Sequence, residues 1–313
     1  MVNKTVSSKY QILSILRSNP FIPISGQLLA DEIGISRVAV WKAVQTLQHS
    51  GYGIKSQGRG QSSGYVLEQD IPDSLFPWEF GEMHTEYRHF IETNSTMDEA
   101  SLLAGHDSKV SIVTAEKQCR GKGRLNHEWI GVPSSLLFTL ITRPQLPVAY
   151  YNCLCSAAQL ALARVLEKMS GRKYFVRWPN DVWSEEGKVS GILTDIRGTG
   201  DMLSWVNLGI GVNLLNKPPI PQSDAVFSVN KEKYPGRRTI LLEFLNEFKI
   251  FERMIYENNS LLVKLWNEKC PDAGKTVSVS GSTDGLSFKG INSRGWAQCE
   301  NGEFPPGEIR FVK

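Results

Sequence analysis

A short stretch rich in glycine and cations, residues 118–124 (Gln-Cys-Arg-Gly-Lys-Gly-Arg), has the composition of an anion-binding loop. Glycine lets the backbone approach a ligand closely and adopt positive φ, so that amide N–H groups can point at an anion. Lys122 and Arg124 would place positive charge where a phosphate or carboxylate sits. The apolar runs 110–114 and 136–142 read as strands on either side. The pattern indicates an anion-wrapping loop between two strands, with an ordinary basic surface loop as the alternative.

Polar side chains at two other strand ends are further candidates. Ser95 and Thr96 follow a short apolar run and precede a helix start, where each hydroxyl can cap the helix or bind a neutral polar ligand. Pro179 ends the next strand-like run, and Asn180 and Asp181 follow it as a polar turn.

Composition limits the class of protein. A chain of 313 residues with 41% hydrophobic and 21% charged residues fits a soluble globular protein of two or three domains. A net charge of +3 is too small for general coating of nucleic acid, so any DNA binding requires a local basic surface. The polar N-terminus and the lack of a long apolar run predict neither a signal peptide nor a membrane span. Five cysteines without paired metal-ligand spacing are typical of reduced thiols in a cytoplasm.

The chain after residue 84 alternates hairpins with long helices. Residues 150–169 form an apolar pattern of helical period, which predicts a helix that covers a sheet. Residues 185–188 read as a hairpin turn, followed by strands over 189–195 and 205–214. This alternation favours an α+β domain with a largely antiparallel sheet over a doubly wound nucleotide fold. The basic loop also lacks the Gly-Lys-Ser/Thr ending of a P-loop.

The first residues predict a helix-turn-helix. A helix begins near Ser25 and a second one begins at Arg37, with Ser36 as its cap and the turn 33–35 between them. The inward stripe of the second helix is Val40, Val44 and Leu47. The runs 51–56 and 64–67 read as a hairpin, or wing, beside these helices. Helix, tight turn and helix is the pattern of DNA-reading proteins, with the last helix as the reader.

The outward face of this reader helix and the tip of the wing are the expected DNA-contacting surface. The expected contacts are Ser36, Arg37, Trp41, Lys42, Gln45 and Arg59. They divide between phosphates and base edges, and the sequence does not say which residue does which. A small protein-interaction module is the alternative, since many winged helices bind protein.

Four segments follow from these patterns. We expect a winged helix-turn-helix domain over 1–69, a linker over 70–83, a central α+β domain over 84–270 and a small C-terminal domain over 271–313. The linker is indicated by Pro72, Pro77 and the absence of periodicity. The C-terminal segment is rich in glycine and short strands, which is typical of a small β-barrel.

Six motifs in order carry a resemblance to a known family. They are Ser95-Thr96, Gly121–Arg124 with Trp129, Arg177–Asp181, Lys188–Leu193, Gly209–Asn213 and, upstream, Ile35–Lys42. In this array the chain resembles the bifunctional biotin protein ligase and biotin operon repressor family. The resemblance implies a class II synthetase-like biotin ligase fold with a central mixed sheet, a winged helix-turn-helix before it and an SH3-like β-barrel after it.

The resemblance also implies an activity. Biotin and ATP would give biotinyl-5'-AMP, with Mg²⁺ on the phosphates and no metal site built from protein ligands. A lysine of a biotin carboxyl carrier protein would then accept the biotin. The same chain would bind operator DNA as a biotin-responsive repressor, as a homodimer when it carries the adenylate. A cytoplasmic location without membrane association is implied as well.

Roles for individual residues follow from the matched motifs. The catalytic candidates are Arg124 and Arg177. The biotin-binding candidates are Ser95, Thr96, Met97, Gln118, Lys122, Gly123, Arg124 and Arg177. The nucleotide-binding candidates are Gly121, Lys122, Arg124, Asn180 and Asn213. Trp129 is interpreted either as core packing or as a wall of the pocket.

The chain departs from the family pattern at a few positions. Arg177 stands where the family usually has lysine, Met97 where asparagine is common, and Arg120 where a small residue is usual. Two other functions remain open: a lipoate-type ligase on the same fold, and a biotin-sensing repressor that has lost ligase activity.

Overall fold

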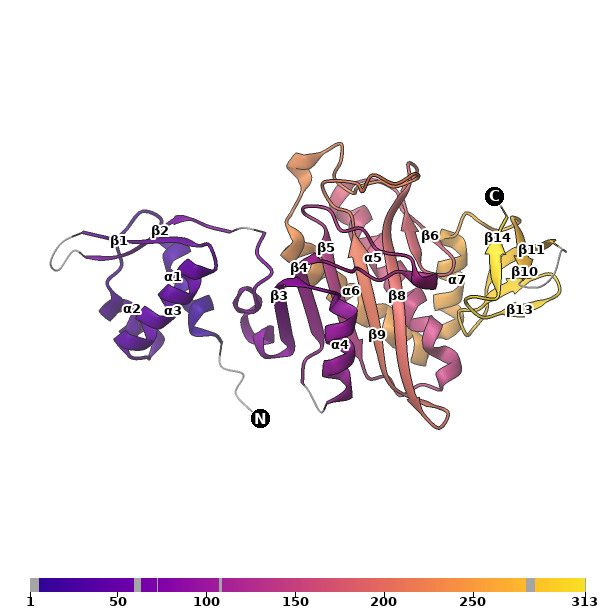
Figure 1. The fold of residues 1–313 in the computed structure, drawn as a ribbon, viewed down its shortest axis with the longest axis horizontal. Coiled ribbons are helices and arrows are strands. Elements are labelled where there is room, and N and C mark those ends of the chain that lie inside the picture. The colour runs from indigo at the N-terminus through magenta and orange to yellow at the C-terminus, as the bar shows by residue number, and fades with distance from the viewer. Residues whose placement is uncertain (1–5, 59–62, 72, 107–108, 280–284, 313) are drawn as a thin grey trace. The chain divides into compact units, whose positions relative to one another are not determined.

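The structure is a computed structural model, which describes residues 6–58, 63–71, 73–106, 109–279 and 285–312. The chain divides into two compact units, Met1–His89 and Phe90–Lys313 (Figure 1). Each unit is described by itself.

The first unit contains the predicted helix-turn-helix and hairpin. Its elements are α1 (Ser8–Ser18), α2 (Gly26–Ile33), α3 (Arg37–His49), β1 (Gly53–Gln57) and β2 (Gly64–Gln69). Ser25 Oγ caps α2 by accepting a hydrogen bond from the Leu28 N–H at 3.1 Å, and Ser36 Oγ caps α3 through the Ala39 N–H at 3.2 Å. Gly34 ends α2 at a φ of 76°, a left-handed conformation that favours glycine. Local capping therefore sets both helix starts that the sequence predicts.

The core of this unit includes the predicted stripe of α3. Val40, Val44 and Leu47 are fully buried, and they pack in one cluster with the buried face of α1. Residues 70–83, where we expected a linker, belong to the same compact unit, which extends to His89. Arg17 of α1 forms ion pairs with Asp70 and Glu79, each at 2.8 Å. These contacts bind the segment to α1, which explains why the unit extends beyond residue 69.

A seven-stranded sheet is the centre of the second unit, in the order β3-β4-β5-β9-β8-β7-β6. The strands are β3 (Tyr87–Thr93), β4 (Ile112–Gln118), β5 (Leu136–Thr142), β6 (Phe175–Arg177), β7 (Asp181–Trp183), β8 (Lys188–Thr199) and β9 (Met202–Val212). All pairs from β4 to β6 are antiparallel. Where β3 and β4 end, the N–H groups of Cys119 and Arg120 donate to the carbonyls of Thr93 and Asn94, each at 2.9 Å. The two bonds advance in the same direction, so β3 and β4 run parallel and the sheet is mixed, as predicted.

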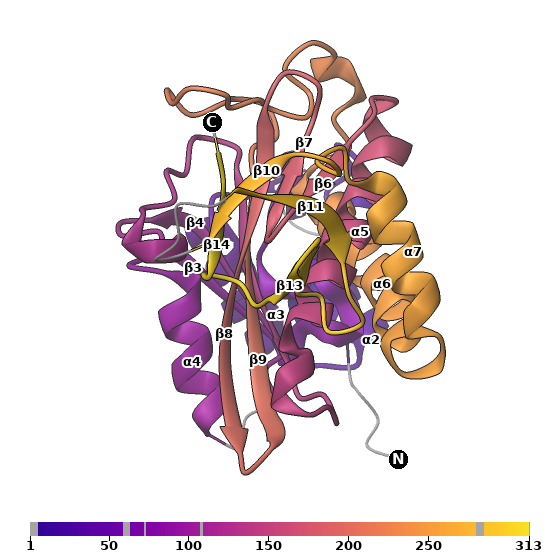
Figure 2. The ribbon, with the colours of Figure 1, turned by 90° about the vertical axis from the view of Figure 1, so that its right-hand side faces the viewer.

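Helices cover both faces of this sheet. Helix α4 (Thr96–Gly105) packs on β4, β5 and β9, and α5 (Tyr151–Ser170) packs on β6 to β9 from the other side (Figures 1 and 2). The apolar helix predicted over 150–169 is therefore confirmed as α5, which is buried over most of its length. Helices α6 (Arg237–Glu257) and α7 (Asn259–Lys269) lie against α5, and the sequence motifs did not predict them.

A second, five-stranded sheet ends the chain, in the order β13-β12-β11-β10-β14. Its strands are β10 (Thr276–Val279), β11 (Gly285–Ile291), β12 (Ala297–Cys299), β13 (Gly302–Phe304) and β14 (Ile309–Phe311). Val277 and Phe288 are fully buried in it. The Trp178 indole N–H donates to the Gly295 carbonyl at 3.2 Å, which joins this sheet to the domain before it.

None of the described helices has the length and apolar character needed to cross a membrane. All five cysteines are free thiols, and only Cys119 is exposed. Burial raises the pKa of the Cys153 and Cys155 thiols to about 12, so these two remain protonated and unreactive at neutral pH.

Candidate functional site

A cavity of about 180 Å³ opens where α4 begins and where β8 and β9 approach the loop 121–129. Its lining residues are Ser95, Thr96, Met97, Gln118, Lys122, Gly123, Arg124, His127, Glu128, Trp129, Asn180, Asp181, Lys188, Gly191, Ile192, Leu193, Gly209, Ile210 and Gly211. The structure therefore brings together three of the stretches that the sequence singles out: 95–97, 118–124 and 180–181.

Neutral polar groups form one end of the cavity. Gln118 Oε1 accepts hydrogen bonds from the N–H and the Oγ1 of Thr96, at 2.8 and 3.0 Å. Thr139 Oγ1 donates to Thr96 Oγ1 at 2.9 Å from the neighbouring strand β5. Ser95 Oγ accepts from the Met97 N–H at 3.2 Å and caps α4. Because Ser95 and Thr96 are buried and bonded to their neighbours, their orientations are set before a ligand arrives.

The loop 121–129 is closed on itself by backbone hydrogen bonds. The Gly123 N–H donates to the His127 carbonyl at 2.7 Å, and the Trp129 N–H donates to the Gly121 carbonyl at 2.8 Å. The expectation of positive φ at its glycines is wrong for Gly123, whose φ is −122°, and it is Leu125 that adopts a φ of 54°. The glycines serve close approach instead. A Cβ at Gly121 would overlap the Trp129 carbonyl, and one at Gly123 would lie 3.0 Å from the His127 carbonyl.

The Gly123 amide is thus used within the loop, so its neighbouring cations are the groups that can meet an anion. Lys122 forms an exposed ion pair with Asp98 in the first turn of α4. Arg124 Nη1 lies 3.5 Å from Asn180 Oδ1, and burial lowers the pKa of the Arg124 guanidinium below its usual value. Desolvation of this charge makes a nearby anion a favourable partner.

Lys188 is a third cation in the cavity, and the sequence interpretation gave it no role. Its Nζ lies 2.7 Å from Asp181 Oδ1 and 5.7 Å from the centre of the Trp129 ring. Lys122, Arg124 and Lys188 are called the cavity cations below. The sequence offered one signal for a role of Lys188, namely its position at the start of the motif 188–193. In the structure it pairs with Trp183 of β7 across the sheet.

Glycines of β8 and β9 form the floor of the cavity. Gly191 and Gly211 are cross-strand partners. A Cβ at Gly211 would overlap the Trp129 indole, one at Gly191 would lie 3.1 Å from it, and one at Gly209 would overlap the sulfur of Met97. The side chains of Trp129 and Met97 therefore occupy space that only glycine leaves open. Trp129 is a wall of the cavity. Two glycines at spacing two share one face of a strand, a signal that was readable from the sequence.

Three expected site residues do not line the cavity. The Arg177 guanidinium lies over the Trp183 ring at 4.1 Å, and its Nε is 3.7 Å from Asp272 Oδ1. Asn213 is buried, and its Nδ2 donates to the Asp224 carbonyl at 3.2 Å. Gly121 lies at the base of the loop, against the Trp129 carbonyl.

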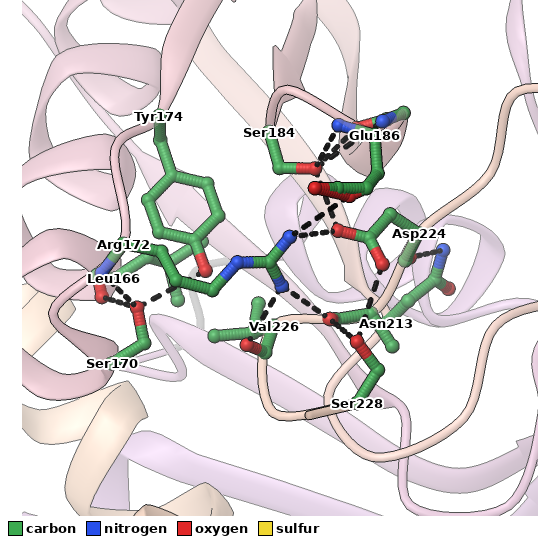
Figure 3. Close-up of polar contacts among 12 residues, drawn as sticks. Leu166, Ser170, Arg172, Tyr174, Ser184, Glu186, Asn213, Asp224, Val226 and Ser228 are labelled. Atoms are coloured by element: carbon green, nitrogen blue, oxygen red, sulfur yellow. Dashed lines mark hydrogen bonds and ion pairs between the residues drawn. The ribbon is translucent and has the colours of Figure 1, made fainter. Parts of the chain in front are cut away.

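Asn213 instead belongs to a second group of polar contacts, centred on Arg172 and called the Arg172 cluster (Figure 3). Arg172 pairs with Asp224 at 2.6 Å and donates to the carbonyls of Ala225 and Val226, at 3.0 and 3.1 Å. Ser184 Oγ also donates to Asp224, at 2.6 Å. Burial favours a raised pKa for the Asp224 carboxyl, but the hydrogen bonds from Ser184 and Arg172 hold this pKa below its usual value. The cluster fixes the connection after β9 against the start of β6.

The first unit carries the other expected site. Arg37, Trp41 and Lys42 of α3 are exposed, and Gln45 is partly buried. Ser36 is also exposed, although its Oγ already serves as the helix cap. Arg59 lies outside the described residues.

A polar hollow of about 390 Å³ adjoins the start of α3. Its lining residues are Ser25, Gly26, Gln27, Arg37, Ser56, Ser63, Gly64 and Tyr65. In it, Arg37 faces the hairpin and the N-terminus of α2, an arrangement that can hold a phosphate. Over the described part of the chain, no three His, Cys, Asp or Glu side chains gather as metal ligands.

Comparison with known proteins gives two matches to family models. Residues 87–213 match the biotin/lipoate A/B protein ligase family, and residues 9–66 match an HTH domain. The chain is 31% identical over 202 residues to the bifunctional ligase/repressor BirA of Bacillus subtilis, covering 62% of this chain and 61% of that protein. It is 28% identical to the Escherichia coli BirA over 218 residues, 68% of this chain and 65% of that protein. The chain thus spans about 61% of the length of the first of these relatives.

A solved structure shows the same fold. The biotin protein ligase from Aquifex aeolicus in complex with biotin and ATP superposes with a TM-score of 0.57 at 24% identity, over 73% of this chain and 99% of that one. All the residues that line the cavity lie within the segment that the first family model matches. Residues 87–213 therefore form a domain of the biotin/lipoate A/B protein ligase family, and an HTH domain precedes it in the same chain.

Proposed function

We propose that the chain is an ATP-dependent biotin protein ligase that also represses transcription in response to biotin. It would form biotinyl-5'-AMP and transfer biotin to a lysine of a biotin carboxyl carrier protein. The observation that carries this proposal is the cavity itself: three cations face a fixed set of neutral polar groups across a floor of glycines. Such a site suits a neutral polar ring with a carboxylate tail that meets a phosphate. The two named relatives are bifunctional ligase/repressors, and a biotin–[acetyl-CoA-carboxylase] ligase of Paracoccus denitrificans is also similar, which agrees with the proposal.

The polar end of the cavity would hold the biotin ring. Ser95, Thr96 and Gln118 offer hydroxyl and amide groups to the donors and acceptors of the ureido ring, and the bonds between them keep these groups in place. Met97 and Trp129 add apolar surface over the glycine floor, which suits the sulfur ring and the alkyl chain. Recognition then needs little rearrangement of this end.

The cavity cations would bring two anions together. A carboxylate oxygen of biotin attacks the α-phosphorus of ATP, and pyrophosphate leaves. Arg124 and Lys188 would neutralise the carboxylate and the α-phosphate in the transition state, and Lys122 would hold the nucleotide from the loop. A carrier lysine then attacks the acyl carbon, and AMP leaves. The loop 121–129, with Gly123 in its turn, would shield the mixed anhydride from water.

Mg²⁺ fits this site as an ion held chiefly by the phosphates. Asn180 and Asp181 place oxygen atoms in the cavity lining, and oxygen is the ligand that Mg²⁺ prefers. The ion would supply charge neutralisation of the triphosphate. Asp181 would also hold Lys188 in position through their ion pair.

Arg177, Gly121 and Asn213 would act from outside the lining. Arg177 faces the same side as Asp181 but lies one strand further out, at the sheet edge, so its charge reaches the nucleotide less directly. Gly121 allows the loop to close on Trp129, and Asn213 supports the connection after β9. These are positioning roles for residues that the motifs assign to biotin and nucleotide.

The test is adenylate formation, followed as pyrophosphate release with biotin and MgATP. Arg124→Ala should lower the rate about a hundredfold, the typical cost of removing one transition-state charge contact. Arg177→Ala should lower it only several-fold. A wild-type rate for Arg124→Ala would refute its role, and equal losses in both variants would place Arg177 at the reacting atoms.

The two remaining domains would bring the macromolecular partners. The C-terminal sheet would be the SH3-like barrel of the family and help to receive the carrier protein. Helix α3 would read operator DNA, as a homodimer formed when the adenylate is bound, and a cytoplasmic location would follow from these substrates. Operator binding measured with and without biotin plus MgATP tests the coupling, which equal affinity in both cases would refute.

A lipoate-type ligase is the second candidate, because the matched family model covers lipoate ligases too. Labelled biotin and labelled lipoate, each offered with MgATP, distinguish the two. Adenylation of neither compound, together with retained biotin binding, would support instead a repressor that has lost ligase activity.

A further inference from the structure

Helix α3 exposes an apolar ridge on its outward face. Val38 keeps 62% of its surface exposed and Trp41 keeps 53%. The two residues are three apart in a helix and therefore lie side by side on its surface. The opposite stripe, which includes Val40 and Val44, is fully buried. Packing within the unit thus does not account for the ridge formed by Val38 and Trp41.

The surroundings of the ridge are basic. Arg37 precedes it and opens onto the polar hollow, and Lys42 follows it. The sequence of α3 contains no aspartate or glutamate. An apolar ridge with cations on both sides matches a duplex, because phosphates border each groove and the bases lie between them.

The major groove has one apolar group to offer. Among the four bases, only thymine carries a methyl group on this edge, and the other edges present hydrogen-bond donors and acceptors. The side chain of Val38 has no polar atom, and the exposed carbon surface of Trp41 gains most from another apolar surface.

We infer that Val38 and Trp41 read thymine methyl groups, so that the operator holds thymine at fixed positions beneath α3. This inference rests on the proposed DNA-binding function and deepens it, because it names the base and the residues that select it. Arg37 and Lys42 contribute affinity through phosphates.

The test removes only the methyl groups. Duplexes that the full chain binds in the presence of biotin and MgATP are first selected from a random-sequence library. One selected duplex is then synthesised with deoxyuridine in place of each thymine in turn, and its Kd is measured at constant salt. Wild-type protein should bind about fourfold more weakly for each contacted methyl that is lost.

Variants assign the loss to residues. Val38→Ala and Trp41→Ala should bind the thymine and deoxyuridine duplexes equally at the position that each residue reads. The matched control Lys42→Ala should weaken both duplexes by the same factor and keep the wild-type ratio. Far-UV circular dichroism checks the folding of each variant, and the Val38 variant suffices if the Trp41 variant does not fold.

Equal wild-type affinity for all thymine and deoxyuridine duplexes would overturn the inference and leave DNA binding intact. The same holds if Trp41→Ala changes the mass of the protein in solution but not the thymine preference, since the ridge would then contact protein. Failure to select any duplex would refute the DNA-binding function itself, and this inference with it.

Discussion

The cavity cations and the Arg172 cluster both contain ion pairs with carboxylates, but they differ in how many partners hold each cation. Arg172 donates hydrogen bonds to Asp224 and to two backbone carbonyls, and Asp224 also accepts a hydrogen bond from Ser184. Lys188 has Asp181 as its ion-pair partner and otherwise faces the cavity. A cation held by several fixed partners stabilises the fold, whereas a cation with one ion-pair partner can exchange it when an anion arrives.

The largest test of this contrast is Lys188→Ala. We expect pyrophosphate release to fall about a hundredfold or more, since a charge contact in the transition state is lost. The melting temperature should hardly change, because this ion pair is partly exposed. Arg172→Ala is the matched control, with a lower melting temperature and an unchanged rate per folded molecule. The opposite pattern in the two variants would invalidate the distinction.

The next largest effect is expected from substitution of a glycine in the floor of the cavity. In Gly211→Ala the new methyl group overlaps the Trp129 indole, so the ring must move into the cavity or lift the loop. Overpacking of this kind costs about 1–3 kcal/mol, and a loss of that size in binding corresponds to about 5-fold to 150-fold in the Kd for biotin. Titration calorimetry measures it. Gly105→Ala is the control, since a Cβ there meets open space, and a similar loss in both would argue against the floor.

The Arg172 cluster predicts a pH effect on stability. The pKa of Asp224 in the folded chain lies below its ordinary value of 3.8. The stabilisation is therefore present above that value and is lost as the pH falls through the folded pKa. Asp224→Asn should lower the free energy of unfolding at neutral pH by about 2 kcal/mol and flatten the loss of stability below pH 4. Denaturant unfolding across pH decides it, and parallel curves for variant and wild type would remove Asp224 from the cause.

The smallest effect concerns α3. Lys42 is exposed on α3, so its ammonium group can reach a phosphate. Lys42→Ala should weaken binding to all duplexes alike and reduce the slope of log K against log salt by about 1. An unchanged slope would mean that Lys42 meets no phosphate.

Much of the fold was predictable because local signals determine it. Ser25 and Ser36 mark helix starts, the apolar run of α5 marks a covering helix, and the hairpin turn at 185–188 leads into β8. Helices α6 and α7 escaped prediction, since they carry no motif and form by packing on α5.

The site was predictable in part for a different reason. Ser95, Gln118 and Arg124 are at strand ends or in loops, and the chain brings them to one cavity. Motif position could not tell that Arg177 is held by Trp183 and Asp272, because contacts with a neighbouring strand and with the segment before β10 decide this.

The meeting of Trp129 with Gly211 has an evolutionary consequence. The Trp129 ring fills the space beside Gly211, so a substitution at either position changes the effect of a substitution at the other. A side chain at position 211 becomes tolerable only after a smaller residue replaces Trp129. Across proteins that match the same family model, the two positions should therefore covary, with any departure from glycine at 211 accompanied by loss of the large ring at 129.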